Sequence, residues 1–397
     1  MTHKPSVLVF AGYYLPSFRA GGPIRTISNC VDRLSGDFDF HIVTRDRDMG
    51  ARSAFDGICA DEWIQVGKAK VMYVDASRIG IRDVARIVKD TPHDVLYLNS
   101  FFDPVFTLRV LLMRRLGHLP ARPVVLAPRG EFSRGALGLK SAKKKVYIRL
   151  AKLLRLYEGV TWQASSDHEM EDIFRNFGDY SKNEILRVKK AENLTQVLGA
   201  PKISEAPVAE ESSSLRICVL ARIGPMKNLR FSLKVLSCVS IPLVFSVYGP
   251  IEDEAYWGEC LALANQLPEH IKFKYMGQVE HDDVVRNLQE HDLFFMPTLG
   301  ENFGHVIYES LRAGLPVLIS DQTPWRDLES KGIGWDLALT DEAGFVRQIE
   351  RFANLTLCQR QEMSGRAAAL ARSLSEDSDV LARNKALFLD SIANFKR

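Results

Sequence analysis

The sequence lacks several features that would assign it to a simple class of protein. None of its six cysteines forms a Cys-x-x-Cys pair, and no histidine stands at metal-ligand spacing to one. A formal net charge of only +3 argues against a general nucleic-acid binder, which would carry a much larger basic excess. No apolar run approaches the ~18 residues that a membrane-spanning helix needs. We therefore expect a cytosolic globular protein with reduced thiols and no nucleic-acid partner.

Common cofactor and catalytic motifs are also missing. The sequence contains no Gly-x-Gly-x-x-Gly, no Walker loop and no supported Ser-His-Asp constellation. The opening segment 1–16 has a short, polar-flanked apolar run without a small-residue cleavage site, which favours a first strand over a secretory signal. Ser166 and Glu169 match a capping box, in which each side chain bonds the other residue's backbone N–H.

What the sequence does contain is a repeated alternation of short β-branched runs and helical segments. The first series is VLVFAG, FHIVT, KVMYV, DVLYLN, PVVLAP and VTWQAS, and the second is LRICVLAR, LVFSVYG, KFKYMG, DLFFMP and PVLIS. Such alternation predicts parallel sheets covered by helices on both faces. We predict an α/β protein with two doubly wound, Rossmann-like domains facing a central cleft, where loops after the strands bind ligands.

The length of 397 residues also favours two domains, and composition suggests their boundaries. We place an N-terminal domain at 1–200, a Pro-, Ala-, Ser- and Glu-rich linker at 201–214, and a C-terminal domain at 215–374. Spaced apolar residues in 375–397 predict an amphipathic helix, which we expect to pack back toward the N-terminal domain.

Two glutamates flank a glycine turn in the second series. Glu301 follows a predicted strand, and Glu309 lies eight positions later inside the helix that begins near Val306. The positive N-terminal end of this helix suits a phosphate group. The spacing suits a ligand with hydroxyl groups on both sides of a diphosphate, such as a nucleoside diphosphate sugar. An isolated pair of glutamates would more often be solvated, so the surrounding residues decide whether this pair binds a ligand.

This stretch resembles the E-G-F-G-x-x-x-x-E motif of the retaining GT-B glycosyltransferases of family 4. Here the first part reads Glu301-Asn302-Phe303-Gly304, with asparagine in place of the commoner glycine. The resemblance implies that Glu301 contacts the donor sugar and that Glu309 binds the donor ribose. Backbone amides near Phe303 to His305 would contact the donor sugar together with Glu301. The donor-binding residues implied in this motif are Glu301, Asn302, Phe303, Gly304, His305 and Glu309.

Two further stretches of the second domain extend the resemblance. The segment from Arg222 to Lys227 resembles the family's G-R-x-x-x-x-K pattern, which implies that both cations neutralise the donor diphosphate. Taken alone, they would more often be surface charges. Base recognition is expected near Tyr248-Gly249 and at Gln278 and Val279, largely through the backbone. The resemblance thus implies Arg222, Lys227 and Glu301 as the catalytic group.

In the first domain, Gly21 and Gly22 follow the first strand and allow backbone N–H groups to approach a phosphate. The resemblance places them against the diphosphate, although a plain turn is the simpler interpretation. Pro128-Arg129-Gly130-Glu131 stands where many family members have histidine, and resembles a subset from bacterial surface-polysaccharide assembly. Arg129, Gly130 and Glu131 are candidate contacts to acceptor or donor, or Arg129 orients Glu131.

The basic segment 134–155 carries no acid. It fits a solvated helix face and, equally, a surface for an anionic membrane or a lipid-linked diphosphate. Asp46-Arg47-Asp48 spells the Asp-x-Asp metal motif of a different glycosyltransferase fold, and we expect no metal there.

The resulting hypothesis is a metal-independent, cofactor-free retaining hexosyltransferase. It would move a hexose from a nucleoside diphosphate sugar to a hydroxyl of a glycan acceptor, lipid-linked, in bacterial exopolysaccharide, capsule or O-antigen biosynthesis. We expect it in the cytoplasm, at the inner face of the membrane. The alternatives are a nucleotide-sugar-binding scaffold without turnover, and a GT-B epimerase or phosphorylase. The sequence leaves the donor base and sugar, the acceptor, the linkage and the oligomeric state open.

Overall fold

The protein is described here from a computed structural model. The described residues are 4–138, 141–178, 186–196, 214–280 and 283–395. The chain divides into two compact units, one of Met1–Gln196 with Asp377–Arg397 (unit 1) and one of Val197–Glu376 (unit 2). Of the predicted linker 201–214, all but the last residue lies outside the described residues.

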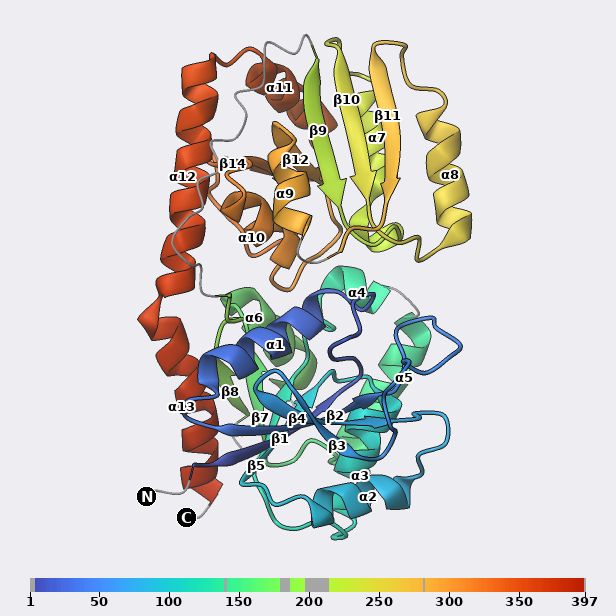
Figure 1. Cartoon of the computed structure of the whole chain (residues 1–397), viewed down its shortest axis with the longest axis vertical. Coiled ribbons are helices and arrows are strands. Elements are labelled where there is room, and N and C mark those ends of the chain that lie inside the picture. Colours follow the sequence, from blue (N-terminus) through green and yellow to red (C-terminus); the bar gives the residue numbers. More distant parts are fainter. Residues whose placement is uncertain (1–3, 139–140, 179–185, 197–213, 281–282, 396–397) are drawn as a thin grey trace. The chain divides into compact units, whose positions relative to one another are not determined.

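Unit 1 is built on an eight-stranded sheet in the order β3-β4-β2-β1-β5-β6-β7-β8 (Figure 1). Its strands are β1 (Ser6–Ala11), β2 (Asp39–Arg45), β3 (Trp63–Val66), β4 (Ala69–Val74), β5 (Val95–Asn99), β6 (Val124–Ala127), β7 (Val160–Ala164) and β8 (Arg187–Lys190). Neighbouring strands are parallel except β3, which runs antiparallel to β4.

Helices cover both faces of this sheet. They are α1 (Gly22–Leu34), α2 (Ile81–Asp90), the short π-helix η1 (Pro104–Leu108), α3 (Arg109–Arg115), α4 (Arg134–Gly138), α5 (Ser141–Leu153), α6 (Asp167–Phe177) and α13 (Ser378–Phe395). Alternate residues of β1 show the two layers, because Leu8 and Phe10 join one buried cluster while Val7 and Val9 join the other. A strand buried on both faces reads as the continuous apolar run seen in the sequence.

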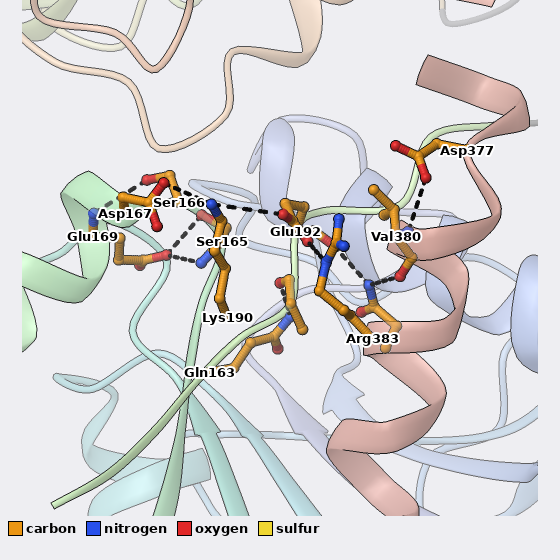
Figure 2. A network of polar contacts seen from close by, with 12 residues as sticks. Gln163, Ser165, Ser166, Asp167, Glu169, Lys190, Glu192, Asp377, Val380 and Arg383 are labelled. Carbon is orange, nitrogen blue, oxygen red and sulfur yellow. Dashed lines mark hydrogen bonds and ion pairs between the residues drawn. The ribbon is translucent and has the colours of Figure 1, made fainter. Parts of the chain in front are cut away.

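The C-terminal helix α13 is part of unit 1. Phe388 inserts into the core there, with its ring 5.4 Å from that of Phe38. Arg383 forms an ion pair with Glu192 at 2.7 Å, and Figure 2 shows this contact beside the end of β8. Leu387 and Phe388 of the predicted apolar stripe are therefore buried against the sheet, whereas Phe395 near the end of the helix is exposed.

Unit 2 has a six-stranded parallel sheet in the order β11-β10-β9-β12-β13-β14. Its strands are β9 (Leu215–Leu220), β10 (Leu243–Tyr248), β11 (Ile271–Gly277), β12 (Leu293–Met296), β13 (Val317–Ser320) and β14 (Gly334–Leu337). Its helices are η3 (Pro225–Lys227), α7 (Leu229–Leu236), α8 (Glu254–Ala264), α9 (Val284–Gln289), α10 (His305–Arg312), α11 (Glu342–Ala353) and α12 (Leu357–Glu376).

This strand order has a topological switch point between β9 and β12. From β9 the chain moves outward through β10 and β11, then returns to β12 on the other side of β9. Loops that follow the two central strands diverge there and leave a crevice for a ligand. The predicted α/β fold class, with two doubly wound sheets, is confirmed. In the part of the chain described, no helix is both long and apolar enough to cross a bilayer.

Candidate active site

The two loops at the switch point of unit 2 are joined by an ion pair. Lys227 ends η3 after β9, and Glu301 follows β12, and the Lys227 Nζ contacts Glu301 Oε1. The two side chains are only 20% and 12% exposed. The structure thus brings together a cation and a carboxylate that the sequence assigns to one donor molecule.

Backbone and hydroxyl contacts fix the geometry around this pair. The Thr298 hydroxyl lies 3.0 Å from the carbonyl oxygen of Met226 and 3.3 Å from Glu301 Oε1. The Asn228 side chain donates a 3.0 Å hydrogen bond to the carbonyl of Pro297. Sequence reasoning missed Thr298 and Asn228. Their only signal was their place directly after the predicted strand and beside Lys227.

The loop after β12 enters α10 through a glycine. Gly304 has φ +76°, a left-handed conformation that favours glycine, and α10 starts at His305. The Phe303 carbonyl accepts a hydrogen bond from the Trp325 indole, and the Phe303 and His305 rings lie 4.8 Å apart. The N-terminal end of α10 is therefore held at the carboxyl end of the sheet, where its positive dipole end suits an anion.

Glu309 lies in the middle of α10 and is only 8% exposed. The neighbouring Ile307 and Leu311 are fully buried and anchor the helix to the core of unit 2. A carboxylate rarely occupies such a buried position without a binding role or a partner.

Arg222, the second predicted cation, forms an ion pair with Glu252. Its Nη1 lies 2.7 Å from Glu252 Oε1, and the pair is partly exposed. Glu252 follows β10 and gave no signal in the sequence. Binding of Arg222 to a diphosphate remains a prediction.

The predicted base-recognition region follows β10 and β11. The Gly249 N–H donates to the Gly277 carbonyl at 2.8 Å, which ties the two strand ends together. A Cβ at Gly249 would lie 1.9 Å from the Ala221 carbonyl oxygen, so this close approach requires glycine. Beyond Gly277, Gln278 is exposed and Val279 packs partly on the core.

Gly21 and Gly22 open α1 in unit 1. Gly21 has φ +69°, and its N–H donates to the Phe18 carbonyl at 3.1 Å. Asp48 braces this loop, because its carboxylate accepts hydrogen bonds from the Ser17 hydroxyl and the Phe18 N–H, at 2.5 and 3.1 Å. The loop is thus held by specific hydrogen bonds, while its contact with a diphosphate remains a prediction.

The other acid of the Asp-x-Asp motif is also engaged. Asp46 forms an ion pair with Arg47 at 2.7 Å, whereas Asp48 points to the Ser17 loop. Within the described ranges, no cluster of three or more His, Cys, Asp or Glu side chains could hold a metal ion. The structure gives this motif a role in shaping a loop.

Arg129 is fixed by three side chains. Its guanidinium donates to Asn99 Oδ1 at 2.6 Å, to Asn193 Oδ1 at 2.8 Å and to the Tyr97 hydroxyl at 2.5 Å. Burial raises the pKa of Tyr97 well above its usual value, although Arg129 opposes that shift. The suggestion that Arg129 orients Glu131 is wrong, because its bonds go to these three partners.

Glu131 and Gly130 are engaged separately. The Glu131 carboxylate accepts from the Ser100 hydroxyl at 2.7 Å and from two backbone N–H groups after β5, and burial raises its pKa. The Gly130 N–H donates to Glu169 at 2.6 Å. All three residues of the Arg-Gly-Glu stretch therefore make internal contacts, and direct contact with acceptor or donor remains a prediction.

The predicted capping box is half correct. The Ser166 hydroxyl accepts from the Glu169 N–H at 3.1 Å. The Glu169 carboxylate instead bonds the Ser165 N–H at 2.8 Å and Gly130, as Figure 2 shows for Ser165. Glu169 serves the neighbouring loop because Gly130 approaches from β6.

We expect Arg129→Met to lower the free energy of unfolding by about 2–4 kcal/mol, because it leaves several buried polar groups without their donor. Chemical denaturation followed by circular dichroism measures this change. Arg82→Met, at an exposed position of α2, is the control and should be nearly neutral. Equal stability of the two variants would contradict the structural role of Arg129.

Part of the chain is similar to a known protein family. Residues 202–369 match the family of glycosyl transferases group 1. The glycosyltransferase match covers the part of the chain that holds Arg222, Lys227, Glu301 and Glu309. An uncharacterised 41.2 kDa protein in the cps region of Klebsiella pneumoniae is 24% identical over 268 residues, 67% of this chain and 71% of that protein.

Solved glycosyltransferase structures share the whole fold. Sucrose-phosphate synthase from Thermosynechococcus elongatus matches with a TM-score of 0.73 at 13% identity, covering 98% of this chain and 100% of that one. The Anabaena protein Alr3699/HepE, solved with UDP and glucose, matches with a TM-score of 0.67 at 14% identity and the same coverage. The fold is therefore GT-B, and unit 2 carries the sequence pattern of group 1 glycosyltransferases.

Proposed function

We propose that this protein is a retaining hexosyltransferase that uses a nucleoside diphosphate sugar and a glycan acceptor. The observation that carries the proposal is the Lys227–Glu301 pair at the switch point of a unit that matches group 1 glycosyltransferases. It places a positive charge and a hydrogen-bond acceptor where a doubly wound sheet binds its ligand. The pair is partly buried, so water screens its charges less than at an open surface.

In the proposed reaction, the acceptor hydroxyl attacks the anomeric carbon from the face that the diphosphate leaves. The departing phosphate oxygen accepts the hydroxyl proton, so no protein nucleophile is needed. Lys227, Arg222 and the N-terminal end of α10 stabilise the negative charge on the leaving group. Glu301 orients the hexose and Glu309 binds the ribose. These positive groups would make the reaction independent of a metal ion.

The biological setting we propose is bacterial exopolysaccharide, capsule or O-antigen synthesis on a lipid-linked acceptor, in the cytoplasm at the inner face of the membrane. The similar Klebsiella protein is encoded in a cps region, which supports a capsule-related role.

The first test is a thermal-shift screen with nucleoside diphosphates and their sugars, in the presence of EDTA. A ligand that binds only the folded state stabilises that state and raises its melting temperature. At a ligand concentration of a hundred times Kd, the stabilisation is about 2.7 kcal/mol. UDP and UDP-glucose come first, because Alr3699/HepE was solved with them. The proposal would be contradicted if none of the nucleoside diphosphates or sugar donors raised the melting temperature.

The alternatives differ from the proposal in turnover. A nucleotide-sugar-binding scaffold would give the thermal shift but no transfer of radiolabelled sugar to any acceptor and no donor hydrolysis. An epimerase on the same fold would convert the donor into its epimer without acceptor. Product analysis of the radiolabelled sugar separates the three functions.

A further inference from the structure

Helix α5 of unit 1 has apolar residues on two faces. Its inner face packs on the core, where Ala151 is buried and the Tyr147 hydroxyl lies 2.8 Å from that of Tyr157. On its outer face Val146, Leu150 and Leu153 are 54%, 51% and 78% exposed. They stand at positions i, i+4 and i+7, which form one stripe along a helix. The inner face explains the folding of α5, and the outer stripe has no role in the core.

The outer stripe continues onto a neighbouring element. The Leu154 N–H donates to the Leu150 carbonyl at 2.9 Å, which carries the helical path one residue further. The Arg115 Nε lies 3.4 Å from the Leu154 carbonyl oxygen, and this brings the exposed Leu116 at the end of α3 to the same place. Among the described residues of unit 1, five of the nine exposed large apolar side chains lie here. Such clustering marks an interaction surface.

Cations flank this apolar stripe. Lys143, Lys145 and Arg149 are exposed on α5, and the sequence contains no acid from 134 to 157. Arg155 forms an ion pair with Glu158 at 3.0 Å, which neutralises its charge. The remaining positive charge of this segment is therefore concentrated on α5. The α5 surface consists of Leu116, Val146, Leu150, Leu153 and Leu154 with Lys143, Lys145, Arg149 and Arg115.

A binding partner of the α5 surface must match both its apolar stripe and its cations. A second copy of the chain would bring two basic clusters together and incur repulsion. A nucleic acid would meet the cations but leave the aliphatic stripe in water. An anionic bilayer meets both needs, because its headgroups pair with Lys and Arg while its acyl boundary takes up Leu and Val.

We infer that the α5 surface docks unit 1 onto an anionic lipid bilayer. The apolar stripe runs along the helix, so α5 lies in the plane of the interface with its leucines directed into the lipid. Lys145 and Arg149, beside the stripe, remain at the level of the headgroups. The docking uses no residue of the donor site, so bilayer binding and donor binding can fail independently.

The test is sedimentation of the full chain with vesicles of phosphatidylcholine, with and without phosphatidylglycerol. The chain should sediment with the anionic vesicles and much less with the neutral ones. Leu150→Ser/Leu153→Ser should weaken anionic binding at least about tenfold, and Lys145→Glu/Arg149→Glu by a similar factor. In Leu153→Trp, the added tryptophan fluorescence should shift to the blue with anionic vesicles, because the indole enters an apolar environment.

The matched control is Leu357→Ser/Leu389→Ser, which removes two exposed leucines from α12 and α13. This variant should bind vesicles as the parent does, and all variants should keep the parent's circular dichroism and melting temperature. Absence of anionic-vesicle binding, or equal binding by the Leu150/Leu153 variant, overturns the inference. A Leu150/Leu153 variant that changes oligomeric state instead of vesicle binding also overturns it, in favour of self-association.

Discussion

Lys227→Ala is expected to lower kcat by about a hundredfold or more, the usual effect of losing one preorganised charge at a developing anion. Lys227 lies at the end of η3, with its ammonium already held by Glu301 at the carboxyl end of the sheet. A charge held in place before the reaction needs no reorganisation when the diphosphate departs. The measurement is kcat and KM for transfer from the donor found in the thermal-shift screen.

Lys234→Ala is the matched control for this variant. Lys234 also forms a lysine–glutamate pair in unit 2, with Glu342 at 2.7 Å, but its side chain is 63% exposed on α7. Exposed pairs contribute little, so this variant should keep the parent's kinetics. A kcat for Lys227→Ala within a few-fold of that of Lys234→Ala would remove Lys227 from the catalytic group.

The central strands were predictable because burial on both faces gives them uninterrupted apolar runs. β1 has all six residues buried, and β12 all four. The strands that the sequence did not reveal, β3, β8 and β14, are all at sheet edges. The residues of β8, RVKK, are half-buried or exposed, so no apolar pattern marks them. An edge strand forms through pairing with its neighbour, and that pairing leaves little trace in the sequence.

The resemblance names the residues of the candidate site one by one, but the contacts between them were not predictable from the sequence. Lys227 and Glu301 are 74 positions apart, and only the strand order places their loops side by side. The same limit applies to Arg129, which bonds Asn193, 64 positions later. Glu252 and Trp325 were missed because one pairs with Arg222 and the other bonds a backbone carbonyl, and neither arrangement follows from spacing.

Glu309→Ala is expected to weaken donor binding about tenfold or more, because a hydrogen bond to a charged group contributes about 1.5–3 kcal/mol. The fold should survive, since alanine is a good helix former and Ile307 and Leu311 still anchor α10. Isothermal titration with the nucleoside diphosphate measures the affinity. Glu329→Ala, at an exposed ion pair with Arg351, is the control and should bind as the parent does.

A change of ligand separates a ribose contact from a general effect on the helix. If Glu309 binds the ribose hydroxyls, a 2′- or 3′-deoxyribose nucleotide should bind the parent more weakly than the normal nucleotide does. In Glu309→Ala, the deoxyribose nucleotide and the normal nucleotide should bind with almost equal affinity, because the carboxylate that bonds the hydroxyl is gone. Two independent, additive losses would mean that Glu309 acts on the site through α10 and that the ribose contact lies elsewhere.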